Sequence, residues 1–203
     1  RCIAVKKERV NDKSLMSKDT TVYPNEEALE LKGDSVSEII WNDNSGTFRD
    51  LRDGKNYSVV QIGDQVWMAQ NLAYRPNRGK FWIYNNDLNY LSQFGFLYNW
   101  ETAKSVCPTG WHLPDKEEFE LLLKYLSANG HDPHSEIIVT GKSGFSAIFG
   151  GLYLGNTFTP LDGGTAFWAS TEKDSRNAYG LSIGSDIKSV NLQNSISKRS
   201  GLP

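Results

Sequence analysis

The apolar residues of this chain come in short runs separated by glycine-containing turns, and this pattern constrains the fold more than any other feature. The pairs Asp53-Gly54 and Gly63-Asp64 stand between the segments TFRDL, NYSVVQI and QVWMAQNL. Such pairs supply the positive φ angles that hairpin turns require, so the segments are predicted to form a three-stranded meander. With 18 Gly, six Trp, nine Tyr and nine Phe among 203 residues, we expect a turn-rich fold whose core is built from rigid rings.

Charge and hydropathy argue against two broad classes of partner. The chain has 22 Lys and Arg against 24 Asp and Glu, for a net charge of −2, so it has no overall positive field and no nucleic-acid partner is expected. Its apolar stretches are only a few residues long, whereas a membrane-spanning helix needs roughly 18–20. We therefore expect a chain that does not span a membrane.

The amino-terminal part is predicted to lie outside the domain. Residues 1–45 are mainly charged and polar, and the patch Ile39-Ile40-Trp41 is one of the few apolar groups among them. This composition is typical of a polar tether, in which residues 1–6 are a candidate closing strand. The domain itself is expected over residues 46–203.

One helix is well defined by the sequence. It is predicted from Asp115 to Leu126, directly after Pro114, and Asn129-Gly130 is expected to end it. One face carries Phe119, Leu122, Leu123 and Leu126, and the first turns carry Glu117, Glu118 and Glu120. Both features favour an amphipathic helix with acidic residues near its amino-terminal end.

The remaining elements are predicted to be short. A second helix is expected over residues 100–104, and alternation over 178–183 and 190–193 indicates half-buried antiparallel strands. The fold class is therefore α+β, with short antiparallel strands, two helices and long irregular loops.

Four sequence blocks occur in a fixed order: TFRDLRDGKNYSVVQIGDQVWMAQNLAY, FGFLYNWETAKSVCPTGWHLPDKEEFELL, GFSAIFGG and FWASTEKDSRNAYGL. With the unusual CPTGWHLP at residues 107–114, they make the chain resemble the Fibrobacter succinogenes major paralogous domain family from about Gly46 to the end. The resemblance implies a C-type-lectin-like fold in its formylglycine-generating-enzyme variant. It also implies an exported bacterial protein at the cell surface, for example a lipoprotein, and some relatives resemble ligand-display tips.

The chain departs from the family pattern at its ends. The family closes with a Gly, two residues and Val-Arg-Cys, whereas this chain ends at Pro203 and begins Arg1-Cys2. Either the opening residues end a preceding copy in a tandem protein, or they supply the closing strand of this domain. The second case could arise by circular permutation, by strand exchange between molecules, or because the closing residues are numbered first. In the second case the resemblance implies a Cys2–Cys107 disulfide, which would stabilise the fold by about 4–5 kcal/mol.

No reactive constellation stands out. The chain has no nucleophile-elbow pattern, and no Cys follows Cys107, so the late-chain thiols of formylglycine-generating enzymes have no counterpart. His112 is expected to be structural, and His131 and His134 to lie in an ordinary polar turn. We expect no catalytic residues, no metal site and no cofactor. Two oxygen-rich clusters could hold calcium, Asn85, Asn86, Asp87 and Asn89 in one and Glu172, Asp174 and Asn177 in the other, but surface turns explain both more simply.

The predicted ligand-binding residues lie on loops. Rings beside amide side chains suit both sugar and protein ligands, although a core built from rings would use the same residues. The candidates in the aromatic loops are Trp82, Tyr84, Asn85, Asp87, Tyr90 and Tyr153, with Phe81 and Phe158 beside them. A second candidate rim is the turn that carries Glu172, Asp174, Arg176 and Asn177, for which a plain charged hairpin is the alternative.

These observations predict a non-catalytic, exported bacterial surface module. It would bind a glycan or protein ligand through its loops, with the polar amino-terminal segment holding it away from the cell. The alternatives are a structural repeat unit of a multidomain surface protein, or an enzyme with a deep pocket of titratable groups around His112.

Overall fold

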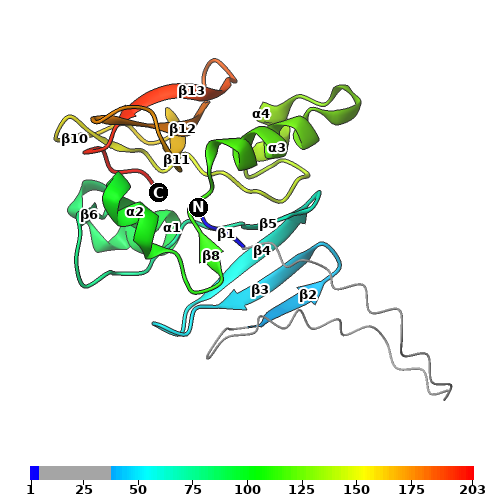
Figure 1. Ribbon diagram of the computed structural model, residues 1–203, viewed down its shortest axis with the longest axis horizontal. Coiled ribbons are helices and arrows are strands. Elements are labelled where there is room, and N and C mark those ends of the chain that lie inside the picture. Colours follow the sequence, from blue (N-terminus) through cyan, green and yellow to red (C-terminus); the bar gives the residue numbers. More distant parts are fainter. Residues whose placement is uncertain (5–37) are drawn as a thin grey trace, which may run out of the picture.

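The computed structural model describes residues 1–4 and 38–203 (Figure 1). These residues form an α+β fold, as predicted, with mostly short antiparallel strands. Most of the predicted tether, residues 5–37, lies outside the described residues. The meander and the three-stranded carboxy-terminal sheet lie on opposite sides in Figure 1, and the two chain ends lie between them.

The larger sheet has six strands in the order β2-β3-β4-β5-β1-β8. Its strands are β1 (Ile3–Ala4), β2 (Ile39–Asn42), β3 (Ser45–Arg49), β4 (Asn56–Ile62), β5 (Gln65–Met68) and β8 (Trp111–His112). The predicted meander is present as β3, β4 and β5, and Gly54 and Gly63 in its turns have positive φ. The sheet also includes β2, which pairs with β3 although its residues were assigned to the tether. The predicted boundary at residue 46 therefore omits a strand of the sheet.

The second sheet has three antiparallel strands in the order β11-β12-β13, and two short ribbons complete the strand content of the described residues. The strands are β11 (Gly164–Glu172), β12 (Asn177–Gly184), β13 (Val190–Ser197), and the pairs β6 (Phe81–Trp82) with β7 (Leu97–Tyr98) and β9 (Tyr153–Leu154) with β10 (Thr157–Phe158). The strands predicted from alternation over 178–183 and 190–193 are thus confirmed.

Two of the helices match the predicted ones. They are α2 (Trp100–Val106) and α3 (Lys116–Leu126), and the described residues also form the short helices α1 (Leu91–Phe94) and α4 (Pro133–Ile137) and the 3₁₀ turns η1 (Tyr84–Asn86), η2 (Leu88–Tyr90) and η3 (Ala128–Gly130). Asp115 caps α3 in a capping box with Glu118, which explains why the helix begins there. Phe119, Leu122 and Leu126 of the predicted apolar face are buried.

The opening residues occupy the closing position of the larger sheet. Ile3 pairs with Trp67 of β5 on one side and with His112 of β8 on the other. Cys2 forms the predicted disulfide with Cys107, with the two Cα atoms 5.9 Å apart. Of the two placements considered from the sequence, the structure therefore shows the one in which the head completes this domain.

The core consists mainly of rings, as expected. Trp67 and Trp168 are the largest fully buried side chains. The indole of Trp168 donates a hydrogen bond to the Tyr98 carbonyl at 2.9 Å, and that of Trp100 donates one to the Ala169 carbonyl at 2.8 Å. These bonds join the three-stranded sheet to the segment that carries α2 and satisfy buried donors of the core.

Candidate functional site

The long aromatic loop is ordered by its own asparagine and aspartate residues. Asn85 and Asn86 adopt positive φ angles of 50° and 57°, a region that Asn visits more readily than most residues. The Asp87 side chain accepts a hydrogen bond from the Asn89 backbone at 2.9 Å and caps η2. These polar residues therefore shape the loop, and Asp87 uses one carboxylate oxygen to do so.

The predicted rings gather from two separate loops into one continuous cluster. Trp82 stacks on Tyr153 with ring centres 4.4 Å apart, and Tyr153 lies 5.1 Å from Phe158. Phe158 in turn lies 5.4 Å from Tyr84, which is 5.3 Å from Tyr90. The structure thus brings together residues that are about 70 positions apart in the sequence, as distant pairs in a core commonly are.

The members of this cluster differ in exposure. Tyr84 is buried, and its hydroxyl donates a hydrogen bond to the Thr159 carbonyl at 2.9 Å. Trp82, Tyr90 and Tyr153 are half-buried. Tyr84 therefore belongs to the core, which was the alternative weighed for these rings, whereas Trp82 keeps a surface that a ligand can reach.

Trp82 borders a cavity of about 400 Å³, which we call the ring hollow. It is lined by Lys55, Arg75, Phe81, Trp82, Ile83, Asn86, Leu88, Leu91 and Phe96. Gly201 supports the indole from behind, since a Cβ atom there would lie 2.7 Å from the Trp82 ring. One side chain of the predicted set thus forms part of a concave surface.

A larger cavity of about 720 Å³, which we call the amide hollow, shares Lys55, Leu88 and Leu91 with the ring hollow. Its other lining residues are Arg1, Asn56, Tyr57, Ser58, Ala69, Gln70, Asn71, Ala73, Ser92, Gln93, Val139, Ser146 and Ile148. Because three side chains line both cavities, the two hollows adjoin each other.

Asn71 lines the amide hollow from a buried position. Its side chain is buried and donates a hydrogen bond to the Phe94 carbonyl at 2.9 Å. Its Oδ1 atom has no hydrogen-bond partner within the described part of the chain. This oxygen is shielded from solvent, so the exposed amides Asn56, Gln70 and Gln93 are the amide groups of the hollow that a ligand can reach.

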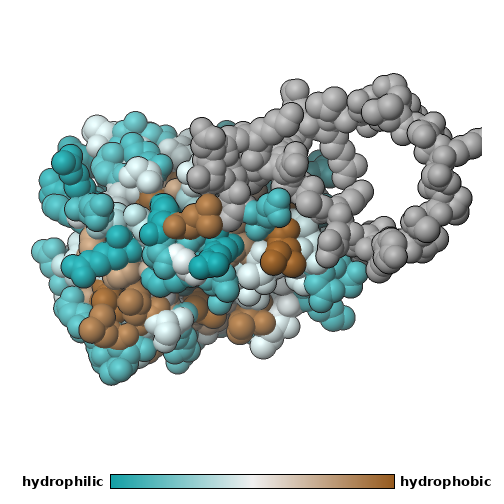
Figure 2. Space-filling model, turned by 90° about the horizontal axis from the view of Figure 1, so that it is seen from below, coloured by the Kyte–Doolittle hydropathy of each residue, from teal (hydrophilic) through white to brown (hydrophobic). Residues whose placement is uncertain are grey.

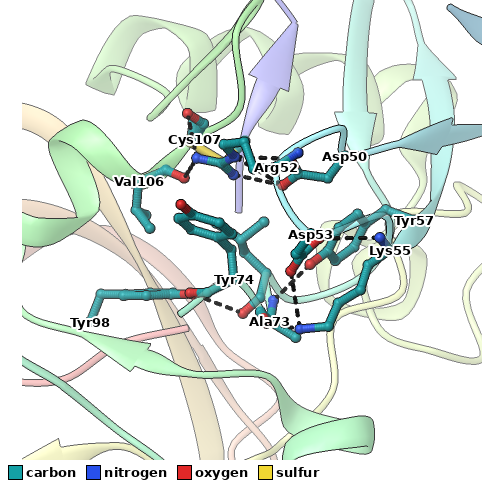
Figure 3. A network of polar contacts seen from close by, with 12 residues as sticks. Asp50, Arg52, Asp53, Lys55, Tyr57, Ala73, Tyr74, Tyr98, Val106 and Cys107 are labelled. Carbon is teal, nitrogen blue, oxygen red and sulfur yellow. Dashed lines mark hydrogen bonds and ion pairs between the residues drawn. A yellow bond between two sulfur atoms is a disulfide. The ribbon is translucent and has the colours of Figure 1, made fainter. Parts of the chain in front are cut away.

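A polar network fixes the wall that Lys55 belongs to (Figure 3). The Arg52 guanidinium forms an ion pair with the fully buried Asp50 at 2.7 Å and lies over the Tyr74 ring at 3.7 Å. The Lys55 ammonium is 3.2 Å from an Asp53 carboxylate oxygen and also donates to the Ala73 carbonyl. Figure 3 shows Arg52 and Asp50 close to Cys107, and Lys55 with Asp53 and Ala73 in a second group farther from it.

Two tyrosines near this network are held in their neutral form. The Tyr57 hydroxyl accepts a hydrogen bond from the Ala73 backbone at 3.1 Å, and burial raises the pKa of Tyr57 to about 12. The Tyr98 hydroxyl donates to the Tyr74 carbonyl at 2.6 Å, and burial likewise raises its pKa. Neither phenol ionises near neutral pH, so both act as structural groups.

Comparison with known families identifies the domain. A family model described as the Fibrobacter succinogenes major domain matches residues 60–202. The chain belongs to this family. No curated protein and no solved structure matches the chain.

The matched region of the Fibrobacter succinogenes major domain covers most of the candidate site. Trp82, Asn71 and Arg75 fall inside it, whereas Arg1 and Lys55 fall outside. The two hollows are therefore built partly from residues that precede the matched region.

The second predicted rim of this major domain is a self-contained turn. Asp174 accepts hydrogen bonds from the Asn177 side chain and from the backbone of Arg176 and Asn177. The hydrogen bond from the Asn177 side chain lowers the pKa of Asp174. Glu172 forms an ion pair with Lys198. None of the four predicted residues lines either hollow, so the structure does not bring this turn together with the ring hollow or the amide hollow.

The histidines each have a local partner. His112 Nε2 lies 2.9 Å from the Glu118 carboxylate, and His131 Nδ1 lies 3.2 Å from Glu136. His134 Nε2 lies 2.8 Å from the Gly184 carbonyl.

Over residues 1–4 and 38–203, no three His, Cys, Asp or Glu residues form a group that suits a metal ion. Within the same residues no helix has the length and apolar character needed to cross a membrane.

Several lining residues were missed from the sequence. Asn71, Arg75 and Lys55 stand in ordinary polar surroundings, and their position in a hollow depends on contacts with distant segments. Leu88 offered a signal in the sequence, because it is an apolar residue in an Asn-rich loop. In the structure its side chain is 73% exposed. A large apolar side chain at such a position indicates a contact surface.

Proposed function

We propose that this chain is a non-catalytic, exported surface module on a C-type-lectin-like scaffold, and that it binds a short glycan across the ring hollow and the amide hollow. The observation that carries the proposal is the half-buried Trp82 indole in a hollow of about 400 Å³, which adjoins a hollow of about 720 Å³ lined by exposed amide side chains. Small-ligand sites are typically concave, with volumes of about 300–1,000 Å³ and a few convergent polar groups.

The arrangement of rings and amides supports a sugar as the ligand. The half-buried indole of Trp82 offers a flat apolar face to a sugar ring, and the exposed amides Asn56, Gln70 and Gln93 offer donors and acceptors for hydroxyl groups. On the face seen in Figure 2, the hydrophobic residues lie in several groups separated by hydrophilic ones.

Membership of the major-domain family supports the surface location. In the described part of the chain the three histidines contact carboxylates or a backbone carbonyl and no Ser, Thr or Cys side chain, which supports a non-catalytic role.

The test is a glycan array followed by calorimetric titration with the oligosaccharides that bind. We expect Trp82→Leu, which keeps apolar bulk against Tyr153, to weaken binding roughly tenfold. Tyr125→Leu is the matched control, since Tyr125 is an exposed ring on α3 that lines neither hollow. Absence of binding to any glycan would contradict the proposal, and equal affinity of the Trp82 variant and the parent chain would exclude the ring hollow.

A further inference from the structure

The lining of the two hollows is electrostatically one-sided. Arg1, Lys55 and Arg75 contribute cationic groups, and none of the described residues that line the hollows is Asp or Glu. A wall of one charge sign around a concave surface concentrates the field and favours ligands of the opposite sign. The net charge of the whole chain is −2, so this positive lining is a local feature.

The three cations are neutralised to different degrees. Lys55 is 3.2 Å from a carboxylate oxygen of Asp53, so its charge is partly compensated. Arg75 is exposed, and the described residues give it no ion pair or hydrogen bond. The nearby carboxylate of Asp87 caps η2 and does not line the hollow. Arg75 is therefore the cation best placed to meet an anionic group.

Arg1 adds a buried charge beneath the amide hollow. Its guanidinium donates to the Met68 and Ser146 carbonyls at 2.9 and 2.7 Å and lies 5.1 Å from the centre of the Phe145 ring. Burial lowers the pKa of the Arg1 side chain to about 9, so the group is still a cation at neutral pH. Its carbonyl partners leave this positive charge uncompensated by any described carboxylate.

We infer that the glycan of the proposed function is acidic, and that a sugar carboxylate binds Arg75 while the sugar ring lies against Trp82. A guanidinium suits this role because its planar N–H groups match both carboxylate oxygens. The exposed Gln70 and Gln93 side chains then offer hydrogen-bond partners to the hydroxyls of a neighbouring sugar in the amide hollow. The inference rests on the proposed function and adds the chemical class of its ligand.

The experiment compares acidic oligosaccharides with their own neutral esters. The full chain is titrated with oligogalacturonides and oligomannuronides, with the methyl ester of each, and with a short polyglutamate peptide. We expect each acid that binds to do so at least tenfold more tightly than its ester at low salt, and the difference to shrink as salt is added. Arg75→Gln should remove most of that difference, whereas Arg78→Gln should preserve it, because Arg78 is exposed in the same loop but lines neither hollow.

Each result has a separate meaning. If acid and ester bind equally and Trp82→Leu weakens both, the acidic class is wrong and the proposed function stands. If neither acid nor ester binds but neutral glycans do, the inference also fails alone. If polyglutamate binds as tightly as the acidic sugars, the hollow recognises charge and not sugar, which overturns the inference. Absence of all glycan binding removes both proposals.

Discussion

Removal of the Cys2–Cys107 bridge should cost more stability than any other single covalent change in this domain. The two half-cystines are separated by 105 positions in the sequence. A cross-link of that span removes loop-closure entropy from the unfolded chain worth about 4.8 kcal/mol at 25 °C. Domains of this size have a total free energy of unfolding of about 5–15 kcal/mol, so the bridge supplies a large share.

The structure adds a reason to expect the full effect. The bridge holds a strand of two residues, Ile3–Ala4, between β5 and β8. Cys2 and Ile3 are each only 2% exposed, so release of this strand also exposes apolar surface. Short strands contribute few hydrogen bonds of their own, and covalent closure offsets the entropy of fixing them.

The assay is equilibrium urea unfolding, monitored by tryptophan fluorescence, of the oxidised chain, the reduced chain and the double variant Cys2→Ala/Cys107→Ala. Alanine avoids the placement of a hydroxyl at a buried position. We expect the reduced chain and the double variant to lose about 4–5 kcal/mol, and their thermal midpoints to fall by about 10–20 °C. A loss below about 1.5 kcal/mol in both would refute the reasoning, since it would show that strand pairing alone holds the closing segment.

Three further predictions concern the network and the ring stack. Asp50→Asn should lower the free energy of unfolding in urea by about 3 kcal/mol, because it leaves the Arg52 guanidinium without its buried charged partner. The control Asp53→Asn, at a half-exposed ion pair, should lower it by less than about 1 kcal/mol. Equal losses in the two variants would contradict this prediction. Burial raises the pKa of Tyr57 from 10.0 to about 12, so the unfolded phenol ionises first and stability should be full below pH 10 and decline towards pH 12. Tyr57→Phe should make that decline shallower in stability measurements across this range, and an unchanged slope would exclude Tyr57 as a cause. Gly201→Ala should lower the free energy of unfolding by about 1–3 kcal/mol and weaken glycan binding in calorimetry, because the new Cβ would collide with the Trp82 indole. If both quantities are unchanged, the stacked rings of Trp82 and Tyr153 can shift freely.

Local signals were enough to predict several elements. The Asp53-Gly54 and Gly63-Asp64 pairs predicted the meander because turn geometry depends on the backbone of those few residues. The helix α3 was predicted for a similar reason, since its cap at Asp115 and its apolar face both lie within one short segment. The four sequence blocks and their order predicted the family, which the match over residues 60–202 confirms.

Features that depend on distant contacts were harder to predict. Strand β2 was assigned to a tether because Ile39–Asn42 follows a polar segment, and only its pairing with β3 shows that it belongs to the sheet. The turn around Asp174 looked like a binding rim, yet its polar groups satisfy one another locally. The hollows escaped prediction because their walls come from segments that the sequence places far apart.

Both ends of the chain contribute to the proposed binding surface. Arg1 lines the amide hollow directly beside the bridged Cys2, and Gly201 backs the Trp82 ring of the ring hollow. Arg1 and Pro203 also lie in contact, with the Arg1 backbone nitrogen 3.3 Å from the Pro203 carbonyl oxygen. Closure of the fold and formation of the site therefore depend on the same residues. It follows that reduction of the disulfide should weaken ligand binding at urea concentrations where the rest of the fold persists, because release of β1 removes a wall of the amide hollow before the core unfolds.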